Sequence, residues 1–166
     1  MKSTNKMSCK KSLIEMSSIT KLIGRVEELH KQQQDEIETM KQVSDNSSVR
    51  NLLFEAEGFQ GGYGISLELL HSITAEMDLL IMLSSIISVL EGNLYVESAD
   101  LIDGDKNGLP ENEPEYYYSL RGKCYASADV SNLIRDELER ISQTANACEK
   151  QQIKGLLKQA MLGGIN

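Results

Sequence analysis

The apolar positions of residues 12–44 follow a seven-residue repeat. Six of the eight seam positions of this heptad are apolar, and the two polar ones, His30 and Gln33, are neighbours in the middle. The repeat predicts a long helix in a coiled coil or an extended bundle. Leu22 and Leu29 lie beside the seam and widen the apolar stripe, which favours a multi-helix bundle. The seam positions are Met16, Ile19, Ile23, Val26, His30, Gln33, Ile37 and Met40.

A second long helical pattern follows Pro114, a residue suited to the first turn of a helix. Its apolar residues recur every three or four positions, and Ser127 and Ser131 weaken the pattern in the middle. The spacing predicts a second long helix that buries one face. The apolar positions are Tyr117, Leu120, Cys124, Ile134, Leu138, Ile141, Ala145 and Cys148, and Leu156, Leu157, Ala160 and Met161 continue the face.

Between these patterns, residues 47–56 predict a short helix, and GFQGGYG at 58–64 predicts a flexible turn because glycine tolerates positive φ. The spacing of these glycines matches neither a Walker A loop nor a dinucleotide-binding loop. Residues 65–90 are the most apolar segment, and their core LLIMLSSIISVL is shorter than the roughly 20 residues that cross a bilayer. This segment predicts a central helix buried on most faces. Residues 95–102 predict a short element before an acidic loop.

These elements predict an all-α protein, an extended helical bundle with two long heptad-patterned helices and a buried central helix. A length of 166 residues suits one domain, which we place at 12–162 with flexible termini at 1–11 and 163–166. With 40% hydrophobic residues, no Trp and two Phe, the core is expected to consist of aliphatic side chains.

The chain is acidic, with a formal net charge of −8. Seven of its acids lie within 97–115, alongside one Lys, whereas 1–11 holds four Lys and no acid. This balance argues against direct binding to nucleic acid phosphates or to an anionic membrane surface, because both need clustered cations. Basic protein partners remain compatible with it.

The three cysteines, Cys9, Cys124 and Cys148, show no disulfide or zinc-binding spacing. Free thiols in a reducing compartment are the simplest interpretation. The amino terminus lacks the apolar run of a secretory signal peptide. We therefore expect a cytoplasmic protein, although a Ser-rich terminus is also compatible with export by a specialised secretion system.

The stretch DGDKNGLPENE at 103–113 resembles the first half of an EF-hand calcium loop. Asp103, Asp105, Asn107 and Gly108 occupy positions 1, 3, 5 and 6 of such a loop, but position 12, which normally supplies a bidentate acid, is Pro114. Asp, Asn and Gly also build ordinary turns between helices. We name the first three as candidate metal ligands, with calcium as the one possible cofactor, and a solvated helix–helix loop as the alternative.

His30 and Gln33 form a polar step in an otherwise apolar seam. Such a step commonly fixes the register or the number of partner helices, so both are candidate partner-binding residues. The alternative is a metal or general-base site in which His30 meets His71 and Glu68 of another helix.

The run Tyr116, Tyr117 and Tyr118 is a further candidate for partner binding, because exposed tyrosines are enriched at recognition surfaces. On a helix one of the three must face inward, which leaves an exposed pair or two ordinary surface residues. Catalytic signatures are missing from the sequence: no serine lies in a GxSxG motif, and no cysteine lies near a histidine. Cys124 and Cys148 fall on the apolar face, so we expect buried, inert thiols.

Three functions therefore compete. The favoured hypothesis is a non-enzymatic helical protein–protein interaction module of the adaptor, inhibitor or chaperone type that self-associates as a homo-oligomer. The second is an acidic regulator or inhibitor that occupies a nucleic-acid-binding protein, in which case binding weakens with salt. The third is a metal-dependent switch or enzyme that uses either the 103–107 ligands, as a calcium-responsive helical protein, or the two histidines.

Overall fold

The computed structural model describes residues 4–43, 46–73 and 78–144, together with Gln151, Lys154, Gly155 and Lys158. Every regular element in these described ranges is a helix, which confirms the expected all-α bundle. The five helices are α1 (Thr4–Lys41), α2 (Ser47–His71), α3 (Leu79–Lys106), α4 (Leu109–Asn112) and α5 (Pro114–Thr144).

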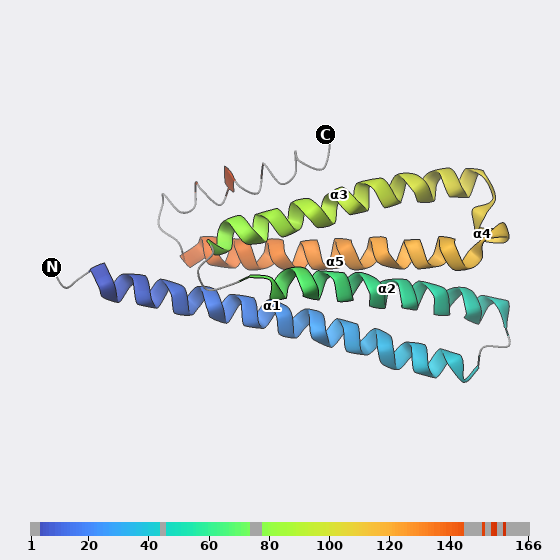
Figure 1. The fold of residues 1–166 in the computed structure, drawn as a ribbon, viewed down its shortest axis with the longest axis horizontal. Helices are drawn as coiled ribbons and strands as arrows, with labels where there is room; N and C mark the ends of the chain where they lie inside the picture. The colour runs from blue at the N-terminus through green and yellow to red at the C-terminus, as the bar shows by residue number, and fades with distance from the viewer. Residues whose placement is uncertain are drawn as a thin grey trace.

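The four long helices lie side by side in the order α1, α2, α5, α3, and the single turn α4 closes the end where α3 meets α5 (Figure 1). α5 packs against α2 on one side and α3 on the other, whereas α2 and α3 barely touch. α1 and α3 are therefore the edge helices. The expectation that residues 65–90 form a buried central helix is wrong, because α3 lies at the edge with Ile81 and Val89 about half exposed, and α5 takes the central position.

The core is almost entirely aliphatic, as the composition predicted. α1 contributes Val26, α3 contributes Leu83, Ile87 and Leu90, and α5 contributes residues from Ala126 to Leu138. Burial of these side chains supplies most of the stability of such a bundle, at roughly 25 cal/mol per Å² of apolar surface removed from water. The apolar seam of α1 faces inward: Ile19 and Val26 are buried in this core, and Ile37 is buried in a smaller second cluster with Leu53 and Ala56. His30 and Gln33 are half-buried.

The expected turn at GFQGGYG is wrong, because α2 runs through it as continuous helix from Ser47 to His71. The glycines here serve close packing instead. A Cβ added to Gly58 would lie 2.1 Å from the carbonyl oxygen of Ser119 on α5, and one added to Gly62 would lie 2.6 Å from the Cβ of Ala126. Gly122 on α5 reciprocates, since its Cβ would lie 2.1 Å from the carbonyl oxygen of Glu55. Only glycine lets the two helices approach this closely.

The segment 65–90 is also divided differently from the prediction. Its first seven residues end α2, and a new helix begins at Leu79, capped by Asp78, whose Oδ1 accepts from the amides of Leu80 and Ile81 at 3.0 and 3.2 Å. α3 then continues through 95–102 to Lys106, so the expected short element is part of the same helix. The backbone of α1 is likewise helical from Thr4, ahead of the predicted start near Ser12.

Candidate interaction surface

The tyrosine run lies in the first turns of α5 and its three rings have different environments. Tyr117 faces inward and is 7% exposed, and its hydroxyl donates a 2.7 Å hydrogen bond to Asp105 Oδ1 at the end of α3. Tyr118 is half-buried and meets Tyr117 edge-on, with 5.2 Å between ring centroids. Tyr116 is 52% exposed. The run therefore offers one outward ring, not an exposed pair, and its role in partner binding stays a prediction.

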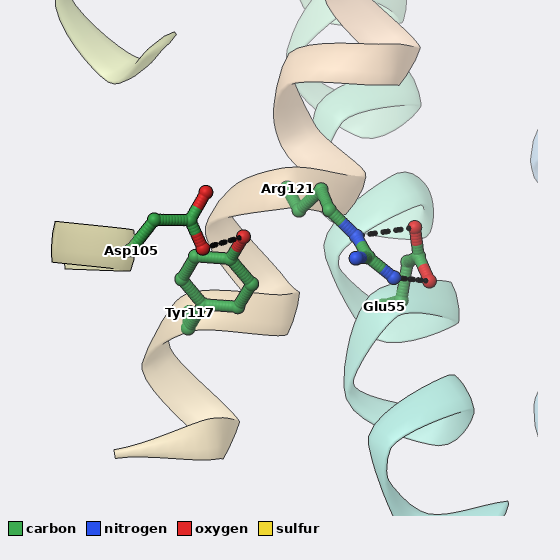
Figure 2. Close-up of polar contacts among 4 residues, drawn as sticks. All are labelled: Glu55, Asp105, Tyr117 and Arg121. Atoms are coloured by element: carbon green, nitrogen blue, oxygen red, sulfur yellow. Dashed lines mark hydrogen bonds and ion pairs between the residues drawn. The ribbon is translucent and has the colours of Figure 1, made fainter. Parts of the chain in front are cut away.

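Arg121, one turn further along α5, links this cluster to α2. Its Nε and a terminal nitrogen donate to the two carboxylate oxygens of Glu55 at 3.0 and 2.7 Å (Figure 2). Its guanidinium also lies 4.7 Å from the ring centroid of Tyr118. The paired carboxylate raises the pKa of Arg121, and the hydrogen bond to Asp105 raises the pKa of Tyr117. These contacts hold α2, α3 and α5 together at this end of the bundle, which is a structural role.

Tyr116 borders a cleft of about 640 Å³ between the start of α2 and the start of α5. Arg50 and Lys123 bring positive charge to its lining, and Glu113 and Glu115 bring negative charge. Mixed charge of this kind fits no single class of ligand, so the cleft supports no assignment of its own.

The candidate polar step of α1 faces α2. His30 Nε2 lies 4.0 Å from the position that a Cβ on Gly64 would take, and Gln33 is half-buried one turn away. His71 and Glu68 are exposed near the carboxyl end of α2. Within the described ranges no three His, Cys, Asp or Glu side chains are placed to hold a metal. The partner-binding role of His30 and Gln33 stays a prediction.

The candidate calcium ligands lie at the end of α3, not in an open loop. Asp103 and Asp105 belong to its last helical turns, where Asp103 lies 3.4 Å from Lys106 Nζ. The side chain of Asn107, the residue that ends the helix, donates to the carbonyl oxygen of Asp103 at 2.8 Å. Only Gly108, with a φ of 69°, has the expected turn geometry. An EF-hand loop wraps its ligands around one point. Here helical geometry places Asp105 on a different side of α3 from Asp103, and the hydroxyl of Tyr117 already donates to Asp105.

Cys124 is buried on the inner face of α5, as expected. Its thiol lies 3.8 Å from Glu97 Oε2, and burial together with this neighbouring carboxylate raises the pKa of the thiol to about 11. A protonated, buried thiol is a poor nucleophile. The predicted burial of Cys148 concerns a residue outside the described ranges.

The largest unexplained feature is the outer face of α3. Ile81, Val89 and Val96 are about half exposed on this face, and Tyr95 and Ile102 are exposed along one flank. Ser85 adds little polarity, because its hydroxyl already donates to the carbonyl oxygen of Ile81 at 2.8 Å.

The only charged residues between 81 and 99 are Glu91, which pairs with Arg135 on α5, and Glu97, which approaches Cys124. Both point toward the bundle. We call residues 81, 82, 85, 89, 92, 96 and 99 the α3 outer face.

The other edge helix is different: over residues 17–41, whose side chains the structure describes, the exposed positions of α1 are polar and most of them are charged. Its exposed residues include Arg25, Glu28, Lys31, Asp35 and Glu38. The described side chains of α1 form no comparable uncharged stripe, and an exposed apolar patch like that of α3 marks an interaction surface.

α3 is also the one described helix long and apolar enough to cross a membrane by length and composition, with 39% of its most apolar window buried in the bundle. A core helix of a soluble bundle meets the same criterion, so this finding is weak support for a membrane location.

Comparison of the chain with models of known protein families, with curated proteins and with solved structures finds no match. The α3 outer face was not predicted, because residues 65–90 were expected to form a helix buried on most faces and residues 95–102 a separate short element. A heptad test applied to the whole stretch would have found a second seam opposite the buried one.

Proposed function

We propose that this protein is a non-enzymatic helical protein–protein interaction module, of the adaptor, inhibitor or chaperone type, that self-associates through the α3 outer face. The observation that supports the proposal is the uncharged stripe on a helix whose opposite side forms the core. Leaving these side chains in water costs free energy that a second helix recovers by covering them.

A second copy of this chain is the occupant that the charge distribution favours. A basic partner would be attracted to the acidic end of the bundle, but the stripe itself carries no acid for it to meet. The stripe fits a partner surface that is also uncharged. A second copy of the chain supplies such a surface, because two-fold symmetry brings the same face of both copies together.

Light scattering on the full chain, with and without a calcium chelator, tests the proposal. We expect a particle of twice the 18.5 kDa chain mass, unchanged by chelator. Val89→Asp should shift the protein to monomer, because the dimer would then bury an unpaired carboxylate. Ile65→Asp on α2 is the matched control, since Ile65 is 49% exposed and Val89 46%, and it should leave the dimer intact.

A monomeric wild type, or a Val89→Asp protein that stays dimeric, would refute the proposal. A mass that changes with calcium would favour the metal-dependent switch instead.

One observation favours a second candidate, the acidic regulator. Six of the seven acids of 97–115 are exposed and lie around one end of the bundle, on α3, on α4, at the junction of α4 and α5, and at the start of α5. Binding of a basic protein domain at this end should weaken at least ten-fold between low and physiological salt, because exposed charges are screened. An affinity that does not change with salt concentration would rule this candidate out.

A further inference from the structure

The α3 outer face carries its own heptad seam, with small and large residues in alternate positions. Spacings of three and four residues connect the members of the seam from 82 to 99. The small residues Ser85, Gly92 and Ala99 recur every seventh position, and so do the larger Met82, Val89 and Val96.

From this seam we infer that two copies pair through α3 in an antiparallel orientation, with the two-fold axis between residues 90 and 91. In this register Val89 lies opposite Gly92 of the second copy, and Val96 lies opposite Ser85. Each layer then places a large residue in the space left by a small one, which gives close packing. A parallel pair would stack valine on valine and glycine on glycine, in layers that are alternately crowded and empty. The inference rests on the proposed self-association and specifies its geometry.

The charges of α3 favour the same orientation. Asp100, Asp103 and Asp105 all lie at its carboxyl end. A parallel pair would bring the two acidic ends together, whereas the antiparallel pair separates the two Asp103 residues by about 37 Å at 1.5 Å per helical residue. That distance exceeds the screening length of about 8 Å at physiological salt. The antiparallel pair does place Asp103 opposite Asp78 of the second copy. These like charges repel each other and salt screens the repulsion, so the dimer should become more stable as salt is added.

Gly92 provides a further reason. Glycine inside a helix costs about 0.5–1 kcal/mol relative to alanine. Gly58, Gly62 and Gly122 are explained by the close approach of α2 to α5, whereas a Cβ on Gly92 or on Gly24 of α1 would meet nothing within 4 Å. Of these two, only Gly92 lies in an uncharged seam. A second α3 packed here would occupy the space left by the missing side chain, as α5 does beside the glycines of α2.

Disulfide trapping with two variant proteins tests the register. Ser85→Cys and Val96→Cys are made separately in the full chain with Cys9→Ser and Cys148→Ser, leaving the buried Cys124 in place. The two proteins are then mixed and oxidised. The antiparallel register places position 85 opposite position 96, so we expect a mixed disulfide dimer. Either protein alone should stay uncrosslinked, because the two introduced thiols would lie about 16 Å apart along the helix, beyond disulfide reach.

Other outcomes overturn specific parts of the reasoning. Crosslinking of each protein with itself but not with the other means a parallel pair, which refutes the register and keeps the self-association. A dimer that forms no crosslink places the interface elsewhere.

The Val96→Cys protein also distinguishes the ways in which the chain could be monomeric. A monomer whose introduced thiol reacts slowly with maleimide means that the chain's own residues 145–166 cover the face. A monomer that reacts quickly means that nothing covers it. Either monomer result refutes the proposed function as well.

Gly92→Leu gives an independent check. The open space around Gly92 means that the monomer tolerates leucine, but in the dimer it would fill the gap that Val89 of the second copy needs. We expect the dissociation constant of the dimer to rise at least ten-fold. Gly24→Leu on α1 is the matched control, because Gly24 is also a helical glycine with nothing within 4 Å of its Cβ position, and it should leave dimerisation unchanged. Equal effects of the two substitutions would overturn the role of Gly92.

Discussion

Gly122→Ala should destabilise the protein although alanine is the better helix former. The added methyl would lie 2.1 Å from the carbonyl oxygen of Glu55 and 2.7 Å from the amide nitrogen of Phe59, both backbone atoms of α2. Backbone cannot rotate away as a side chain can. Relief therefore requires the two helices to separate or to slide.

The size of the effect follows from that displacement. A distance of 2.1 Å is about 1.3 Å inside the shortest ordinary contact of 3.4 Å. If the helices move apart to relieve the clash, gaps of about 0.5–1 Å open between their side chains, and each dispersion contact across such a gap loses about a quarter to a half of its energy. Overpacking of a core costs about 1–3 kcal/mol. With a backbone obstacle we expect a cost near the upper end, about 3 kcal/mol, offset by about 1 kcal/mol of helix propensity. The net prediction is a loss of about 2 kcal/mol.

Urea unfolding followed by far-UV circular dichroism measures this difference, at one protein concentration because association contributes to apparent stability. Gly24→Ala is the matched control, since it adds the same methyl to a helix interior with nothing within 4 Å, and it should raise the free energy of unfolding by about 0.5–1 kcal/mol. If Gly122→Ala is as stable as Gly24→Ala, the helices do not approach as closely as described and the explanation of the glycine-rich segment fails.

Three further predictions concern polar groups on α5. Arg121→Met leaves the carboxylate of Glu55 without its partner, and because the Glu55 side chain is only 14% exposed, the free energy of unfolding should fall by about 1–3 kcal/mol. Arg25→Met removes an exposed ion pair and should lower it by less than about 1 kcal/mol. Ser131→Ala should leave the urea midpoint unchanged or slightly higher, because the Ser131 hydroxyl is the one buried side-chain oxygen or nitrogen in the described ranges without a hydrogen-bond partner; a large loss would mean that it has one. Burial raises the pKa of Cys124 from 9.0 to about 11, so the thiol ionises in the unfolded chain at a lower pH than in the folded protein, and the free energy of unfolding should fall as the pH rises from 9 to 11. Cys124→Ala should make this fall with pH less steep. An equally steep fall in the variant would contradict the raised pKa.

The helical character of the chain and the buried faces of its two longest helices were predictable from the sequence. Both depend on local periodicity: Ile19, Val26 and Ile37 fall on seam positions of one heptad repeat because one side of a helix must meet the core. The inward position of Tyr117 followed from the same geometry.

The candidate sites were less predictable. DGDKNG was expected to form a loop because its residues favour turns, yet Asp103 and Asp105 extend α3, whose packing on α5 continues to Tyr117. Turn propensity is a local preference of a few tenths of a kcal/mol to about 1 kcal/mol per residue, and tertiary packing overrides it.

Periodicity, composition and charge are properties of the chain, so the class of the fold, its aliphatic core and its acidic end were predictable before any helix was placed. The role of the glycines and the surface that is left uncovered depend on how the helices pack. Glycine permits both a turn and a close helix contact, and nothing local distinguishes them until Ser119 and Glu55 are brought to the opposite side. An apolar stripe likewise predicts burial, but the neighbour that buries it is known only once every other helix has been placed. In this bundle α3 lies at the edge, and its outer face has no neighbour among the described helices.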